Sequence, residues 1–282
     1  MIFEFFFLNK LIFLFSRFFY TNQHIRIVNY HDTPSRDANA FEEQLFFYKK
    51  YYTNCDKSGL DNFFFKKIWE AKKPGLIITF DDGLRTNYDV ALALLEKHGF
   101  TGWFCVPPDF IDAPIEQQNQ YMTDFSIGTP QRLSKERTAM NWEELKDLLK
   151  RNHVITSHTK SHHRMKDEDT ELVLDTEIFS SKKYLEHQLN TEIDIFCWVG
   201  GEEKHYTANA YDKIKASGYK YAFMTNNISV LKNTNTFQLQ RTNIESHFPM
   251  AFVKFSLSGI YDLFYWSKRE RVDKKIKFKY NN

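Results

Sequence analysis

The sequence lacks the features by which many protein classes are recognised. Its charge is nearly balanced, with 38 lysines and arginines against 36 aspartates and glutamates, so nothing in it indicates a nucleic-acid partner. It contains no GxGxxG or Walker motif for nucleotides, no CxxC pair and no internal repeat. What remains to carry chemistry is a small number of acidic and histidine motifs.

Cysteine is scarce. The three cysteines, Cys55, Cys105 and Cys197, are widely spaced and odd in number, which argues against a disulfide framework. Cys105 and Cys197 lie in apolar, strand-like runs, and we expect both to be buried thiols. This pattern favours a reducing compartment and therefore a cytoplasmic location.

A long hydrophobic run is also missing from the N-terminal segment. Residues 1–20 are rich in phenylalanine, but Glu4, Lys10 and Arg17 interrupt them, and the longest apolar run is five residues. That run is too short to cross a bilayer, and without a basic start or a small-residue cleavage site the segment is a poor signal peptide. On a helix, Lys10 and Arg17 share one face, which predicts a helix lying in the membrane interface. The alternatives are a helix docked on the protein's own surface and an uncleaved spanning anchor.

The C-terminal end is basic. Between Lys268 and Lys279 there are seven lysines and arginines and two acids. This tail could bind an anionic leaflet, although a solvated helix end has the same composition. With the N-terminal segment, it predicts a cytoplasmic protein that is peripheral on the inner membrane. We therefore divide the chain into an interfacial segment (1–22), one catalytic domain (23–265) and a basic tail (266–282).

The length of 282 residues fits a single α/β barrel. Short apolar runs alternate with helical segments, which predicts parallel strands connected by helices. We expect helices at 41–52, 57–70, 141–151, 167–189 and 205–217. The stretch 109–139 is polar with little periodicity, and we interpret it as a long insertion that could lie over the active site.

Two short motifs carry the chemistry. Asp81 and Asp82 directly follow the apolar run 75–80, and His158 and His162 follow a second short apolar run. Two histidines and one aspartate form a three-ligand metal site with an open position, and the remaining aspartate can act as a general base. Alone, the acids could be a solvated turn and the histidines a polar loop. Their place at the carboxyl ends of parallel strands favours a site, because α/β folds build their sites there.

These motifs resemble those of the polysaccharide deacetylases, the carbohydrate esterases with a NodB-type domain. Thr-Phe-Asp-Asp-Gly at 79–83 is followed about 75 residues later by His-Thr-Lys-Ser-His at 158–162. The resemblance covers roughly residues 25–250 and includes the segments 29–32, 87–100, 101–106 and 216–223. It implies a distorted, seven-stranded (β/α) barrel of the NodB type.

The resemblance also implies residue roles. Asp81 becomes the catalytic base, and Asp82, His158 and His162 become ligands of a divalent metal, for which zinc is well suited although other first-row ions bind such ligands. Metal-bound water would then attack the carbonyl of an N-acetyl group, less readily an O-acetyl group, on a sugar or glycan. The implied setting is bacterial surface-polysaccharide biosynthesis, such as lipopolysaccharide or capsule.

The chain departs from the family pattern at residues 196–203, where the usual arginine is absent. Arg241 could supply that guanidinium from a different strand, or it could be an ordinary structural arginine. Trp198 could line the sugar pocket or pack in the core. Gly200, in a Gly-Gly pair, allows close backbone approach to a substrate or a tight turn.

The general acid is left open between two histidines. His247 is the nearest late histidine but does not fit the family motif cleanly. His31 follows an apolar strand and should lie at the same end of the barrel. Two rival functions remain alongside the deacetylase: an amidohydrolase of the same fold with a non-sugar substrate, and a non-catalytic glycan-binding or scaffold protein.

Overall fold

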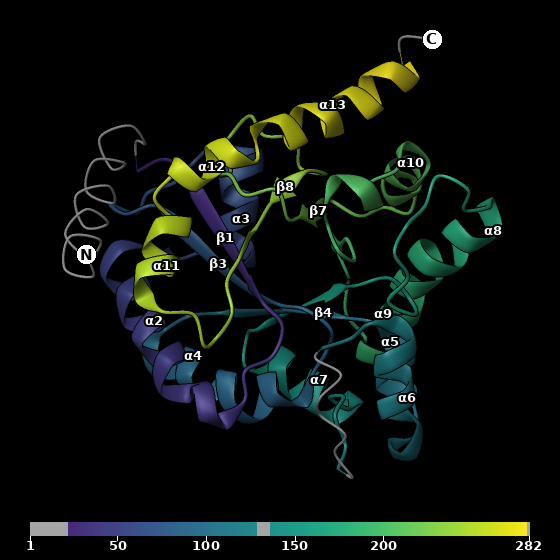
Figure 1. The fold of residues 1–282 in the computed structure, drawn as a ribbon, viewed down its shortest axis with the longest axis horizontal. Helices are drawn as coiled ribbons and strands as arrows, with labels where there is room; N and C mark the ends of the chain where they lie inside the picture. The colour runs from purple at the N-terminus through teal and green to yellow at the C-terminus, as the bar shows by residue number, and fades with distance from the viewer. Residues whose placement is uncertain (1–21, 129–135, 281–282) are drawn as a thin grey trace.

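The computed structural model describes residues 22–128 and 136–280, which form a parallel β-barrel surrounded by helices (Figure 1). Every pairing between its strands is parallel. The strands are β1 (Ile25–Tyr30), β2 (Thr53–Asn54), β3 (Gly75–Phe80), β4 (Gly102–Val106), β5 (Val154–Ser157), β6 (Ile195–Cys197), β7 (Tyr221–Met224), β8 (Leu239–Gln240) and β9 (Thr242–Asn243).

The barrel is closed by one short segment. The strand order is β8-β7-β6-β5-β4-β3-β1-β9, with β2 added at β3. Only Arg241 separates β8, which pairs with β7, from β9, which pairs with β1. The main path therefore has eight strands by hydrogen bonding, and because β8 and β9 are halves of one stave, seven staves surround the interior. The expected (β/α) barrel is confirmed, and the difference in strand number reflects the break at Arg241.

Alternation along the strands separates two apolar layers. Ile25, Ile27 and Ile77 belong to the cluster that fills the barrel interior, together with Trp103 and Cys197. The intervening residues face outward and pack against the helices. This is the two-residue period of a strand that is buried on both faces. All three cysteines are free and buried, as expected for Cys105 and Cys197.

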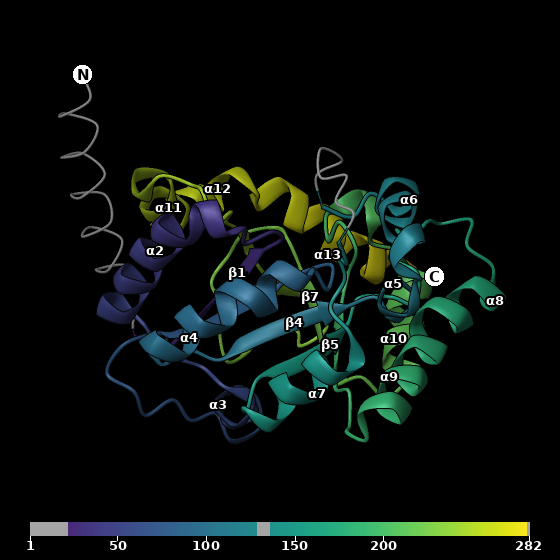
Figure 2. The same cartoon turned by 90° about the horizontal axis from the view of Figure 1, so that it is seen from below.

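The helices form the outer layer around these strands. In Figure 2, α11, α12 and α13 run along one side of the molecule, opposite α7. The α-helices are α2 (Ala38–Tyr51), α3 (Lys57–Asp61), α4 (Leu92–His98), α5 (Pro108–Asp112), α6 (Ile115–Phe125), α7 (Trp142–Lys150), α8 (Glu171–Leu174), α9 (Ser181–Leu189), α10 (Ala208–Ala216), α11 (Met250–Ser256), α12 (Ile260–Phe264) and α13 (Trp266–Tyr280). Short 3-10 and π segments are η1 (Ser35–Asp37), η2 (Asn62–Lys66), η3 (Asn87–Ala91), η4 (Asp175–Ser180) and η5 (Glu203–His205).

Most of the expected helices are present, with shifted ends. Helix α7 begins after Asn141, whose side chain accepts a hydrogen bond from the Glu144 amide while Glu144 reciprocates, forming a capping box. The expected helix 167–189 is α8, η4 and α9 in continuous order from Glu171. The expected helix 57–70 ends at Lys66, because Lys67 takes the left-handed conformation.

The stretch 109–139 was expected to lack periodic structure, and this is wrong for its first part. Helices α5 and α6 occupy it, and α6 buries only Gln118 and Met122. So narrow a buried face leaves little apolar periodicity in the sequence, which is why the helix is hard to predict. Ser126 and Gly128, which follow α6, line the main cavity.

Two expectations concern the ends of the chain. The interfacial helix predicted for 1–22 lies outside the described residues, apart from Asn22. Residues 266–280 form α13, which lies on the barrel through Arg269, bonded to the carbonyls of Asn226 and Asn227. Within the described ranges, no helix combines the length and the apolar character needed to cross a bilayer.

Candidate active site

A polar cavity of about 410 Å³ opens at the carboxyl end of the barrel strands. Its floor contains Asp81, Asp82, His158, His162 and Arg241. The acids follow β3, the histidines follow β5, and the arginine lies between β8 and β9. Segments separated by as many as 160 residues therefore meet at one point, as expected where parallel strands end at the same edge of a barrel.

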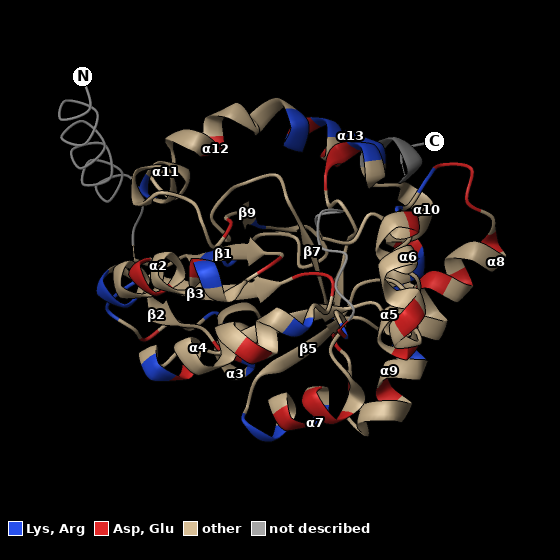
Figure 3. Cartoon of the chain, turned by 60° about the horizontal axis from the view of Figure 1, so that its bottom comes forward, with Lys and Arg blue, Asp and Glu red and all other residues tan. Residues whose placement is uncertain are grey.

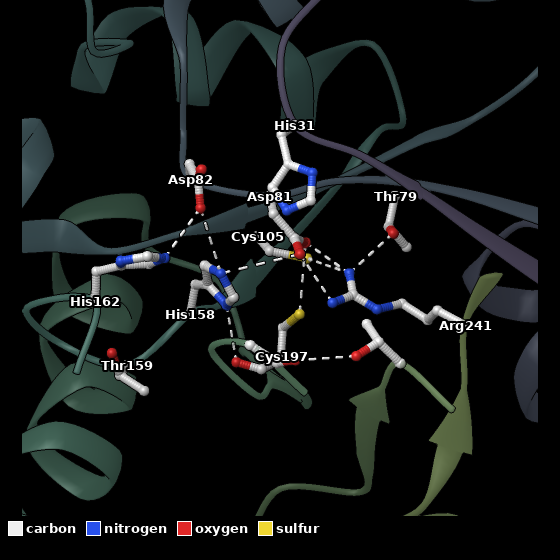
Figure 4. Close-up of polar contacts among 12 residues, drawn as sticks. His31, Thr79, Asp81, Asp82, Cys105, His158, Thr159, His162, Cys197 and Arg241 are labelled. Atoms are coloured by element: carbon white, nitrogen blue, oxygen red, sulfur yellow. Dashed lines mark hydrogen bonds and ion pairs between the residues drawn. The ribbon is translucent and has the colours of Figure 1, made fainter. Parts of the chain in front are cut away.

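Asp82 faces both histidines (Figure 4). Its Oδ1 atom lies 3.1 Å from His162 Nε2 and 3.6 Å from His158 Nε2. The ligand atoms of the three residues lie within 4.8 Å of one another, and all three side chains are buried. The sequence-predicted ligand set is therefore brought together by the fold.

The outer nitrogen of each imidazole is bonded to a backbone carbonyl. His158 Nδ1 lies 2.9 Å from the carbonyl oxygen of Cys197, and His162 Nδ1 lies 2.7 Å from that of Phe125. A carbonyl oxygen only accepts, so Nδ1 carries a hydrogen in each ring, and Nε2 is the ring nitrogen that faces Asp82. This is the arrangement that orients metal-binding histidines.

The carboxylate of Asp82 is only half satisfied. Its Oδ2 accepts a hydrogen bond from the Gly128 amide at 3.2 Å, while Oδ1 is buried without a hydrogen-bond partner among the described residues. Burial alone would raise the pKa of Asp82, but the contacts with His162 and His158 and the charge of His31 outweigh it and hold that pKa well below its usual value. A buried carboxylate oxygen beside the Nε2 atoms of two imidazoles fits a divalent cation, and the donor set is one that zinc prefers.

The backbone around these ligands is unusual. Asp82 and His162 have φ values of 76° and 67°. Positive φ values are uncommon for residues other than glycine. Gly83 and Thr159 also have positive φ, at 68° and 61°. Left-handed residues of this kind cost free energy and gather at functional sites. Here they turn the chain so that adjacent side chains face different partners.

Asp81 faces Arg241, and its Oδ2 atom also lies 4.0 Å from His158 Nε2 (Figure 4). Two parallel contacts join Arg241 to Asp81, Nη1 to Oδ1 at 2.6 Å and Nη2 to Oδ2 at 2.8 Å. Cys197 Sγ donates to the same Oδ1 at 3.6 Å. Burial alone would raise the pKa of Asp81, but the charges of Arg241 and His158 outweigh it and hold that pKa well below its usual value. Asp81 is therefore an ionised carboxylate in a buried place.

Arg241 is fully enclosed in the barrel. Its side chain is 0% exposed, and Nη1 also donates to Thr79 Oγ1 at 3.0 Å. The same residue interrupts the stave that closes the barrel, which is how its side chain reaches the interior. The guanidinium expected from the sequence is thus next to Asp81, although it is on a different strand from the position of the missing family arginine.

His31 and Glu245 form a second polar pair in the cavity wall. His31 Nδ1 lies 2.7 Å from Glu245 Oε1, and the His31 side chain is 38% exposed. Burial lowers the pKa of His31, but the bond to Glu245 and the charges of Asp82 and Asp81 overcome this and raise it to about 10. His31 is therefore positively charged at neutral pH.

His247 also lines the cavity, but at its rim. It is exposed, and its ring packs edge-on against Phe248 with centroids 5.0 Å apart. Both candidate acids thus border the cavity, and only His31 lies against a carboxylate, among the contacts given for the described residues.

Trp198 packs in the core, which was the alternative to lining the pocket. It is 1% exposed, packs against Phe196 and Tyr206, and is not among the described residues that border the cavity. The reason is alternation, because Cys197 faces the barrel interior and its neighbour must face outward. Gly200 does line the cavity, with φ of 73°, and a Cβ there would come 2.8 Å from His205 Cδ2.

Glu245 was not identified from the sequence as a site residue. Asn29 pairs with Asn243 in the β1–β9 register, so His31 and Glu245 stand opposite each other two residues further on. A carboxylate at the end of an apolar segment was the only available signal. The partner of that carboxylate depends on strand register, which no local pattern gives.

Comparisons with known proteins agree with this fold. Similar solved structures include a deacetylase from Streptococcus pyogenes, PplD in complex with acetate, with a TM-score of 0.63 and 20% identity over 79% of this chain and 93% of that one. A de-N-acetylase from Aggregatibacter actinomycetemcomitans has a TM-score of 0.66 and 17% identity over 83% of this chain and 100% of that one. IcaB from Ammonifex degensii has a TM-score of 0.56 and 15% identity over 83% and 96%. At such identities the likeness establishes the fold.

Among curated proteins, none matches the sequence. Residues 70–222, more than half of the chain, match the family model described as polysaccharide deacetylase. That match includes Asp81, Asp82, His158 and His162. The chain therefore belongs to the polysaccharide deacetylase family.

Proposed function

We propose that this protein is a metal-dependent hydrolase that removes the N-acetyl group from a sugar or glycan. The main support for this proposal is that two adjacent carboxylates have different partners. Asp82 offers an unpartnered, buried oxygen to His158 and His162, while Asp81 is kept ionised by Arg241 a few ångströms away. A cation site beside a buried base is an arrangement suited to metal-assisted amide hydrolysis.

In this proposal Asp82, His158 and His162 hold a divalent ion, most suitably zinc. When bound, such an ion supplies Lewis acidity that polarises the acetamide carbonyl and lowers the pKa of water. Asp81 takes the proton from the attacking water. Because each Asp81 oxygen already accepts a bond from Arg241, the carboxylate is fixed in orientation and has further lone pairs free for that proton.

The leaving amine requires a proton, and His31 is the proposed donor. Its bond to Glu245 keeps the ring protonated and aims the other ring nitrogen away from that carboxylate. The carbon–nitrogen bond then breaks to give acetate and the free amino sugar. His247 stands at the rim, where we propose that it contacts substrate together with Gly200.

Two further elements belong to the proposal. The description of the Aggregatibacter neighbour as a de-N-acetylase supports an amide over an ester substrate. A cavity of about 410 Å³ is in the range that encloses a small ligand such as one sugar unit. We propose surface-polysaccharide biosynthesis, such as lipopolysaccharide or capsule, as the setting, with the protein in the cytoplasm and peripheral on the inner membrane.

The first experiment is elemental analysis of the purified wild type and of His162→Ala. We expect about one zinc or similar ion per wild-type chain and none in the variant. His187→Ala is the matched control, because His187 is exposed on α9 outside the cavity, and it should keep the metal. A wild type without metal even after reconstitution would contradict the hydrolase and favour the glycan-binding or scaffold role.

The second experiment measures acetate release from N-acetylated sugars, O-acetylated sugars and simple acetamides. Release from the N-acetylated sugars, lost in His162→Ala and retained in His187→Ala, is the expected result. Release from the simple amides alone would overturn the sugar substrate and favour the amidohydrolase with a non-sugar substrate.

A further inference from the structure

An exposed apolar edge lies on the helices that follow the cavity wall. Leu263, Phe264 and Trp266 are 71%, 69% and 62% exposed, and Phe252 and Ile260 are also exposed. These five residues, which we call the α11–α12 edge, fall within 15 positions of the sequence. Monomeric proteins seldom gather large apolar side chains in this way without a partner.

The exposure of this edge is fixed by the packing of α12. Asp262 is buried and makes a bidentate contact with Arg26, at 2.9 and 2.7 Å, on the outer face of β1. Ile260 and Phe264 are four residues apart and share the helix face opposite Asp262. The buried ion pair therefore fixes the orientation of α12, and this orientation keeps the apolar residues exposed.

The helix that follows the edge carries a net positive charge. Between His247 and Ser267 the chain carries a single acid, Asp262, which is buried, and a single cation, Lys254. Helix α13 follows directly with five basic and two acidic residues between Lys268 and Ile276. Glu202 and Glu203 pair with Lys268 and Arg271, while Lys274 is exposed. Figure 3 shows the mostly uncharged α12 followed by α13, which carries both blue and red bands.

The edge is continuous with the cavity mouth. Glu245 and His247 line the cavity, and Pro249 caps α11 immediately afterwards. Ring contacts then connect Phe248 to Phe252 at 5.0 Å and Phe252 to Tyr261 at 6.2 Å. A surface bound at this edge would therefore meet the protein beside the opening of the active site.

We propose that the α11–α12 edge docks on an anionic lipid surface. Leucine, isoleucine and phenylalanine insert below the headgroups, tryptophan and tyrosine prefer the interface, and lysine and arginine attract anionic lipids. A second copy of this chain would offer the same apolar residues and the same net positive α13, in which Glu270 and Asp273 are the two acids against five cations between Lys268 and Ile276. Charge complementarity thus favours the lipid surface. Binding to lipid requires no catalysis, so it stands or falls independently of the proposed hydrolysis.

The test is co-sedimentation of the full-length protein with vesicles of phosphatidylcholine alone and with vesicles containing phosphatidylglycerol. The variant is the double substitution Leu263→Gln and Phe264→Gln. The matched control is Leu172→Gln, because Leu172 on α8 is 76% exposed and lies away from the edge. Mass in solution is measured for each protein by light scattering.

We expect the wild type to bind the anionic vesicles more tightly than the neutral ones. The double variant should lose at least about tenfold in binding, since burying one large apolar side chain is enough for such a factor, and Leu172→Gln should bind as the wild type does. Equal binding by the double variant and the wild type would overturn the proposal and attribute docking to another segment, such as 1–21. A wild type that binds no vesicle, or a dimer lost in the double variant with vesicle binding unchanged, would overturn it as well.

Discussion

Asp81 and Asp82 are neighbours in the sequence, but their side chains have different partners. Asp81 points into the barrel, where Arg241 contacts both of its oxygens. Asp82 points to His158 and His162, and one of its oxygens is left buried without a hydrogen bond among the described residues. The left-handed backbone of Asp82, with φ of 76°, turns the two side chains apart.

The difference teaches how one short motif supplies two functions. A carboxylate that is fully paired with a guanidinium has no need of a metal, and it is fixed as an anion. A carboxylate that has one oxygen without a hydrogen bond, next to two imidazoles, is suited to bind a cation. Replacing Asp82 should therefore impair metal binding, whereas replacing Asp81 should impair the catalytic rate.

The largest effect is expected from Asp82→Ala. Without its carboxylate the two imidazoles are a two-ligand site, so we expect loss of metal and loss of detectable deacetylation. Metal content and acetate release measured on the same sample check this. Full metal occupancy in Asp82→Ala would contradict the role given to this residue.

Asp81→Asn should separate catalysis from metal binding. A general base contributes about 10²- to 10⁴-fold in rate, so we expect a fall in kcat of that size with the metal retained. The measurement is steady-state kinetics together with elemental analysis. If the metal is lost with the activity, Asp81 belongs to the ligand set and the distinction between the two carboxylates fails.

Arg241→Lys should weaken the support of Asp81. Lysine keeps the charge but cannot make two parallel contacts, and we expect the free energy of unfolding to fall by about 1.5–3 kcal/mol. Because Arg241 lowers the pKa of Asp81, weakening it raises that pKa, and activity should be lost at a higher pH on acidification. Chemical denaturation and the acidic limb of the pH–rate profile report the two effects.

Arg26→Lys is the matched control for Arg241→Lys. Arg26 is also buried and contacts an aspartate in the same bidentate way, but on the outside of the barrel. It should lower stability by a similar amount and leave the acidic limb in place. An equal shift of that limb in both variants would show that the shift reflects general destabilisation.

Glu245→Gln should move the basic limb of the pH–rate profile. The bond to Glu245 helps to raise the pKa of His31 to about 10, so a neutral partner lowers that pKa. His31 must be protonated to donate, and activity should therefore fall at a lower pH as the medium becomes alkaline. His247→Gln should leave the basic limb unchanged, and a shift in that variant instead would identify His247 as the acid.

The smallest effect on activity is expected from Trp198→Phe. Trp198 packs against Phe196 and Tyr206 outside the barrel wall, so its truncation should lower stability by about 1–3 kcal/mol and leave KM for the sugar unchanged. Thermal unfolding and KM are the measurements. A large rise in KM with unchanged stability would return Trp198 to the substrate pocket.

Much of the barrel could be predicted from local patterns. The apolar runs at 25–28, 75–80 and 101–106 lie in or overlap β1, β3 and β4, and the helix predicted at 141–151 is α7, which begins directly after Asn141. Helix α6 escaped prediction because its buried face is narrow. Local patterns succeed where one face of an element is clearly apolar, and they fail where burial is slight.

The sequence by itself determined that Asp81, Asp82, His158 and His162 lie at the ends of parallel strands, because strand ends are marked by local composition and parallel strands share one edge. Only the tertiary structure decided that Arg241 reaches Asp81, that Glu245 stands opposite His31, and that Trp198 faces away from the cavity. These three outcomes depend on strand register and on the closure of the barrel. Register is fixed by hydrogen bonds between segments far apart in the chain, and no single segment carries that information.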